Sequence, residues 1–255
     1  MRLILVRHGE TMYNAQRRFT GQSDVPLNTL GKRQAAALGE CLATQHLDVI
    51  VTSDFERTRV TAETIARHHG LPIQEDIDLR ELALGEWEGY TYDEVLARDA
   101  DLVTHWRIDP VAYAPPGGET VAQLRDRCAR SLKRWQTQYP EASVLWVTHG
   151  GLIGVLLCHL LDIDLKRRWQ FRHDNASISE LHIRGERVTI VRLNETAHIR
   201  ALMLKTEKVV ELTKTHEERN DRLSILPGDI PLPTTPCIAS TERSAEAEDR
   251  EGGQS

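Results

Sequence analysis

Short apolar runs, separated by helical patterns, are the feature that most constrains the fold of this chain. Residues 3–6, 48–52 and 144–147 are each short and almost wholly apolar. Such runs are typical of strands in a parallel sheet, because helices cover both faces of that kind of sheet. Residues 177–183 and 187–193 are two later strand candidates, which we expect to form a hairpin. The pattern predicts an α/β protein built on a mainly parallel sheet.

Local signals place the starts of the helices between these runs. Asn28 is a predicted N-cap, since its side-chain oxygen can accept a bond from a free amide of the first turn. Two pairs, Ser53 with Glu56 and Thr120 with Gln123, have the spacing of a capping box. We therefore expect one helix to follow each of these three sites.

Two regions depart from this alternation. Residues 82–118 are rich in Gly, Trp, Tyr and Pro and show no clean period, which predicts an insertion or lid. Residues 201–226 predict a helical extension, and residues 227–255 predict a disordered tail that buries too little apolar surface to offset its chain entropy. We expect one domain over residues 1–200, followed by this extension.

Composition bears on location and partners. The formal net charge of −6 gives no sign of nucleic-acid or membrane binding. No signal peptide is evident, and the longest apolar run, residues 152–161, is too short to span a bilayer. None of the four cysteines forms the close pair of a zinc or redox motif. We expect a cytoplasmic protein with no metal or other cofactor, no nucleic-acid or membrane partner, and a homodimer as a candidate assembly.

Two histidines follow two of the predicted strands. His8 comes directly after the first strand, in Arg7-His8-Gly9, and His149 follows residues 144–147 and precedes Gly150. Ligands of open α/β sheets bind at the carboxyl ends of the strands. Both imidazoles are therefore expected over one crevice, with the amino end of the next helix aimed at it.

Two arginines and a carboxylate complete the candidate site. Arg57 lies near the start of the helix after residues 48–52, and with Arg7 it offers planar donors suited to a phosphate. A neutral imidazole is a competent nucleophile near pH 7. Fixed cations can stabilise a transferring phosphoryl group, a role that magnesium has in other enzymes. Glu81 is the candidate general acid and base, with Glu86 and Glu88 as alternatives.

These residues resemble the signature of the histidine phosphatase superfamily, which includes the cofactor-dependent phosphoglycerate mutases. The resemblance extends in order over residues 1–200. Its motifs are Leu5-Val6-Arg7-His8-Gly9-Glu10-Thr11, Asp24-Val25-Pro26-Leu27, Ser53-Asp54-Phe55-Glu56-Arg57-Thr58, Gly85-Glu86-Trp87-Glu88-Gly89, Pro116-Gly117-Gly118-Glu119-Thr120 and Thr148-His149-Gly150-Gly151. The resemblance implies a three-layer sandwich with a mainly parallel central sheet, helices on both faces and one antiparallel edge strand.

The resemblance also implies roles. His8 would carry the phosphoryl group and Glu81 would act as acid and base. Arg7, Arg57 and His149 would act on the phosphoryl oxygens, although Asn14, implied to assist them, could instead be a turn or cap residue. The implied phosphate-binding residues are Arg7, Asn14, Gly21, Arg57, His149 and Gly150. His8 and His149 could also be zinc ligands, but two nearby cations disfavour a metal ion.

The expected function is a metal-independent phosphomonoesterase that hydrolyses small phosphorylated metabolites through a phosphohistidine. Gly151 and the short insertion between Glu81 and His149 resemble the phosphatase branch of the family. A 2,3-bisphosphoglycerate-dependent phosphoglycerate mutase and a non-catalytic relative that binds a phospho-ligand or a protein are the alternatives. The aromatic residues of the insertion either shape the pocket or pack in the core; they are Trp87, Tyr90, His105, Trp106 and Tyr113.

Overall fold

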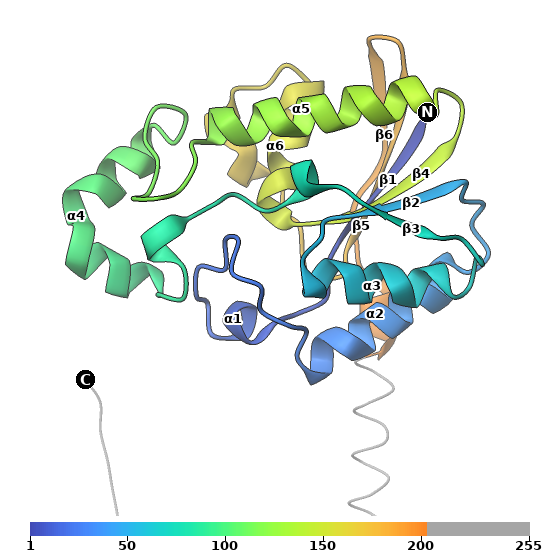
Figure 1. The fold of residues 1–255 in the computed structure, drawn as a ribbon, viewed down its shortest axis with the longest axis horizontal. Helices are drawn as coiled ribbons and strands as arrows, with labels where there is room; N and C mark the ends of the chain where they lie inside the picture. Colours follow the sequence, from blue (N-terminus) through green and yellow to red (C-terminus); the bar gives the residue numbers. More distant parts are fainter. Residues whose placement is uncertain (203–255) are drawn as a thin grey trace, which may run out of the picture. The chain divides into compact units, whose positions relative to one another are not determined.

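The computed structural model describes residues 1–202 of the chain (Figure 1). The predicted extension over residues 201–226 and the predicted tail over residues 227–255 lie outside the described residues, apart from residues 201 and 202. In chain order the elements are β1 (Arg2–Arg7), α1 (Met12–Ala15), α2 (Thr29–Leu42), β2 (Val49–Thr52), α3 (Glu56–Ala66), β3 (Ile73–Glu75), the 3₁₀ helices η1 (Ile77–Leu79) and η2 (Gly85–Trp87), α4 (Tyr92–Ile108), α5 (Val121–Gln138), β4 (Ser143–Thr148), α6 (Gly150–Leu160), the 3₁₀ helix η3 (Leu165–Gln170), β5 (Ile178–Arg184) and β6 (Arg187–Glu195).

The strands form one six-stranded sheet in the order β3-β2-β4-β1-β5-β6. β3, β2, β4 and β1 run parallel, while β5 is antiparallel to both β1 and β6. The predicted mainly parallel sheet is therefore confirmed, and its antiparallel part is the β5–β6 hairpin at one edge. β1 and β4 are adjacent although more than a hundred residues separate them, and this pairing brings the two histidine-bearing strand ends together.

Alternate residues of the buried strands supply two separate cores. Leu3, Leu5 and Val51 face a cluster with α5 and α6. Ile4 and Ile50 face a second cluster with α2 and α3. Figure 1 shows these two helix pairs on opposite sides of the sheet. A strand that buries both faces must be apolar at every position, which is why its sequence is a continuous apolar run.

The helix starts follow local signals at two of the three predicted sites. The side chains of Asn28 and Thr120 cap α2 and α5, as expected. The predicted capping box of Ser53 is wrong, because α3 begins later and its N-cap, Phe55, makes no side-chain bond. A carboxylate from a distant part of the chain caps this helix instead: Asp24 Oδ1 accepts a hydrogen bond from the Glu56 amide at 2.8 Å.

Residues 82–118 contain a long helix that the sequence pattern did not predict. α4 begins at a capping box of Thr91 and Glu94, and Asp99 interrupts it with non-helical angles of φ −131° and ψ 45°. This kink rotates the second half of the helix relative to the first, so no single 3.6-residue period extends through the segment. Trp87 and Trp106 from this region pack in the core beside α5.

Candidate active site

The pairing of β1 with β4 sets the two histidines side by side. Arg7 is in register with Thr148, and the amide of His8 donates to the Thr148 carbonyl at 3.0 Å. The imidazole centroids of His8 and His149 are 5.2 Å apart, with an interplanar angle of 64°. Both side chains are buried. The two sequence motifs therefore meet at the carboxyl edge of the sheet, where open α/β proteins bind their ligands.

His8 is held in one tautomer. Its Nδ1 lies 2.7 Å from the Gly9 carbonyl, and a carbonyl only accepts, so Nδ1 carries the proton. Nε2 then has a free lone pair and makes no hydrogen bond within residues 1–202. Burial holds the pKa of His8 well below its ordinary value, and the guanidinium groups of Arg57 and Arg7 lower it further. The imidazole is neutral near pH 7, which is the nucleophilic form.

The two arginines present unpaired positive charge beside this ring. Arg7 Nη1 donates to the His173 carbonyl at 2.6 Å, and Arg57 donates to the carbonyls of Ser23 and Gly21 at 2.8 and 2.9 Å. The Nε atoms of both arginines are buried with no hydrogen-bond partner in the described chain. Burial lowers the pKa of Arg57 to about 10, which still leaves it charged at neutral pH. A buried cation without an anion indicates that the site accepts one.

Glu81 lies at the amino end of α6. Its carboxylate accepts the amides of Gly151 and Leu152 at 3.0 and 3.1 Å, a position that the helix dipole favours for an anion. A Cβ atom at Gly151 would lie 2.5 Å from Glu81 Oε1, so only glycine leaves the carboxylate this place. Of the three carboxylates considered, Glu81 lines the cavity, while Glu88 is bound by Gln22 and Ser23.

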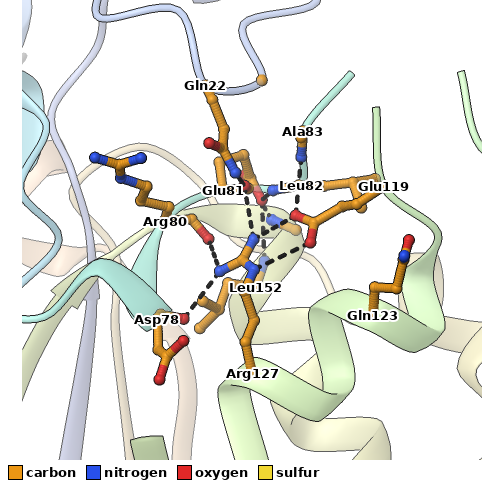
Figure 2. A network of polar contacts seen from close by, with 12 residues as sticks. Gln22, Asp78, Arg80, Glu81, Leu82, Ala83, Glu119, Gln123, Arg127 and Leu152 are labelled. Carbon is orange, nitrogen blue, oxygen red and sulfur yellow. Dashed lines mark hydrogen bonds and ion pairs between the residues drawn. The ribbon is translucent and has the colours of Figure 1, made fainter. Parts of the chain in front are cut away.

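Figure 2 shows the network that holds the segment carrying Glu81. Arg127 of α5 donates to the main-chain carbonyls of Asp78, Arg80 and Glu81 at 2.9, 2.5 and 2.8 Å. The same guanidinium pairs with Glu119 at 2.5 and 3.1 Å, and Glu119 also accepts the Ala83 amide at 3.0 Å. The glutamate of the Pro-Gly-Gly-Glu-Thr motif, Glu119, is therefore part of this network. Through its bonds to Arg127 and to the Ala83 amide, it links α5 to the segment that carries Glu81.

A cavity of about 520 Å³ opens over this edge of the sheet, within the size range of small-molecule sites. Most of the predicted site residues line it: Arg7, His8, Asn14, Gly21, Arg57, Glu81 and Gly150. His149 does not line it; the ring packs between His8 and Phe55, and neither nitrogen has a partner within residues 1–202. The Asn14 oxygen accepts from the Thr11 amide and Asn175, so Asn14 is a capping residue whose amide group also borders the cavity.

Several wall residues were not predicted from the sequence. His173 and Arg168 come from the segment between α6 and β5, which has no recognised motif. Of the aromatic candidates in residues 82–118, Trp106 lines the cavity, whereas Trp87 is fully buried and His105 stacks on Tyr113 at 5.0 Å. No local signal distinguishes these roles, because each depends on how distant elements pack.

No group of three or more His, Cys, Asp or Glu side chains within residues 1–202 is arranged to hold a metal ion. No helix of the same part of the chain has both the length and the apolar character needed to cross a membrane.

The fold is a mainly parallel sheet with helices on both faces. At the carboxyl edge of this sheet lie two histidines and two arginines that have no carboxylate partner within residues 1–202. These features are those of the α/β proteins that bind anionic ligands at this edge. The family model of the histidine phosphatase superfamily (branch 1) matches residues 3–196. This chain belongs to that family.

Individual relatives agree with this assignment. The chain is 32% identical over 210 residues to phosphoserine phosphatase 1 of Hydrogenobacter thermophilus, covering 82% of this chain and 100% of the relative. It is 40% identical over 169 residues to the glucosyl-3-phosphoglycerate phosphatase of Mycolicibacterium vanbaalenii, covering 64% and 75%. The solved structure of the alpha-ribazole phosphatase of Shigella flexneri matches with a TM-score of 0.72 and 29% identity, covering 77% of this chain and 98% of that one.

Proposed function

We propose that the protein is a phosphomonoesterase that hydrolyses small phosphorylated metabolites through a phosphohistidine on His8. One observation carries the proposal: a neutral, buried imidazole with a free Nε2 lies beside two arginines that have no carboxylate partner within residues 1–202. The relatives support the same reaction class, since they are named phosphoserine phosphatase, glucosyl-3-phosphoglycerate phosphatase and alpha-ribazole phosphatase.

The residues suggest a two-step mechanism. His8 Nε2 attacks the phosphorus while the bond from phosphorus to the ester oxygen breaks, and Glu81 in its acid form gives a proton to the departing oxygen. Water then attacks the phosphorus as the bond to Nε2 breaks, and Glu81 takes the proton of that water. Arg7 and Arg57 stabilise the charge on the equatorial oxygens throughout. His149, beside the His8 ring, is proposed to act on the same oxygens.

Metal independence, a cytoplasmic location and the absence of nucleic-acid or membrane partners belong to the same proposal. Two guanidinium groups supply the positive charge that a metal ion would otherwise supply. Assembly as a homodimer stays a prediction, for which sedimentation of the purified protein is the measurement.

The test compares wild type with His8→Ala on a panel of phosphomonoesters in EDTA. We expect wild type to release phosphate, and the variant to lose turnover while still binding inorganic phosphate, because both arginines remain. A wild type that releases no phosphate, yet interconverts phosphoglycerates once 2,3-bisphosphoglycerate is added, would be a mutase. Near-normal turnover in the variant would show that His8 is not the nucleophile.

A further inference from the structure

Arg168 is a buried cation in the cavity wall that the proposed mechanism does not use. The residue is 3% exposed, and it lines the same cavity as His8. Within residues 1–202 it has no salt-bridge partner, and its hydrogen bond is a long one, 3.5 Å from Nη1 to the Leu165 carbonyl. Buried charges in proteins are ordinarily paired, so an unpaired one in a cavity indicates a missing anion.

The surroundings of Arg168 fix its position. The guanidinium lies 4.3 Å from the ring centroid of Trp169 and 5.9 Å from that of Trp106. A Cβ atom at Gly154 would be 3.0 Å from the Arg168 carbonyl, so glycine allows η3 to lie close against α6. The cation therefore packs against two indole rings, and the residue is buried.

A second unpartnered donor lies next to it. The indole Nε1 of Trp106 is buried with no hydrogen-bond partner in the described residues, and Trp106 also lines the cavity. A guanidinium and an indole N–H are both donors and neither accepts. Together they match a group that carries negative charge and only accepts hydrogen bonds, and a carboxylate has this chemistry in a planar form.

This pair is anchored by other contacts than the donors proposed to bind phosphate. Arg7 and Arg57 are anchored to the carbonyls of His173, Ser23 and Gly21, whereas Arg168 is anchored between tryptophans. One cavity therefore presents two sets of cationic donors, and a monoester with only a phosphate would leave the second set unpaired.

We propose that Arg168 and Trp106 form a subsite for a carboxylate on the substrate, so the enzyme selects phosphate monoesters of small hydroxy acids. The proposal rests on the proposed function, because it assumes that the phosphate occupies the arginines beside His8. The subsite determines which monoester is bound and takes no part in the transfer of the phosphoryl group.

The test uses two monoesters that differ at one carbon. 3-Phosphoglycerate has a carboxylate where glycerol 3-phosphate has a hydroxymethyl group. We expect the kcat/KM of wild type to be about tenfold higher or more for 3-phosphoglycerate than for glycerol 3-phosphate. A charge-assisted hydrogen bond in a buried site strengthens binding by about this factor. Arg168→Gln should remove most of this preference, measured as the ratio of the two kcat/KM values within the variant.

Arg167→Gln is the matched control, because Arg167 is its neighbour in η3, is exposed, and the substitution removes the same charge. The control should keep the wild-type preference. Because the readout is a ratio of two substrates within one variant, a partly unfolded sample does not mimic the result. Binding of both compounds to His8→Ala, measured by calorimetry, gives the same comparison without turnover.

The outcomes separate the two proposals. A wild type that hydrolyses both monoesters equally, or an Arg168→Gln variant that keeps the preference, would overturn the subsite and leave the phosphatase proposal standing. A protein that hydrolyses neither compound, nor p-nitrophenyl phosphate, would remove the proposed function. Preferential binding of 3-phosphoglycerate by His8→Ala would in that case still support the subsite, and equal binding would overturn it.

Discussion

Arg127→Met is expected to destabilise the domain and to slow turnover, because one guanidinium holds both an ion pair and the loop that carries Glu81. The side chains of Arg127 and Glu119 are 11% and 16% exposed. Removing one partner of a buried pair costs about 3–5 kcal/mol. Glu119 keeps its bond from the Ala83 amide, so we expect the low end, about 3 kcal/mol. For a domain of this size each kcal/mol shifts Tm by about 2–4 °C, which predicts a Tm lower by about 6–12 °C.

The kinetic part of this prediction tests positioning rather than folding alone. Arg127 donates to the Glu81 carbonyl, so its loss should disorder the proposed acid. We expect kcat/KM to fall about tenfold or more for an alkyl phosphate, whose leaving oxygen needs a proton. The fall should be much smaller for p-nitrophenyl phosphate, whose leaving group needs little protonation. A loss of folded protein alone would lower both values equally.

Arg130→Met is the control for this experiment. Arg130 is on the same helix and pairs with Asp78 at 3.2 Å, but its side chain is 63% exposed. An exposed pair contributes about 0–1 kcal/mol, so Tm should change little. Thermal unfolding and steady-state kinetics of both variants check the reasoning. Equal Tm shifts in the two variants, or an Arg127→Met variant with equal losses on both substrates, would refute it.

Two further predictions concern Gly151 and His173. Gly151→Ala should lower kcat about tenfold or more with little change in KM, because its Cβ would displace the Glu81 carboxylate; unchanged kinetics would contradict the assignment of Glu81. Burial lowers the pKa of His173 from 6.5 to about 4, so between these pH values the unfolded chain binds a proton that the folded chain does not. The free energy of unfolding should therefore fall as the pH drops through this range. His173→Asn should reduce that slope in urea titrations at several pH values, and an unchanged slope would assign the dependence to other groups, such as His8 and His149.

Much of the sheet and the centre of the site were predictable from the sequence because their signals are local. A strand buried on both faces needs an uninterrupted apolar run, and the run of β1 shows this in four consecutive residues. His8 and His149 were identified because each lies two residues after such a run, and parallel strands end at one edge. Asn28 and Thr120 were identified as caps because a cap acts only three residues away.

Tertiary structure decided everything that depends on partners far apart in the chain. The amino end of α3 is satisfied by Asp24, more than thirty residues earlier, so its own Ser53 was misleading. Arg167 and Arg168 are the same residue type at neighbouring positions, yet one is exposed and the other is buried in the cavity wall. Composition and period cannot separate them, because the difference arises only when η3 packs against α6. The sequence by itself identified the residues of the proposed site, and long-range packing decided which of their charges have no partner within residues 1–202.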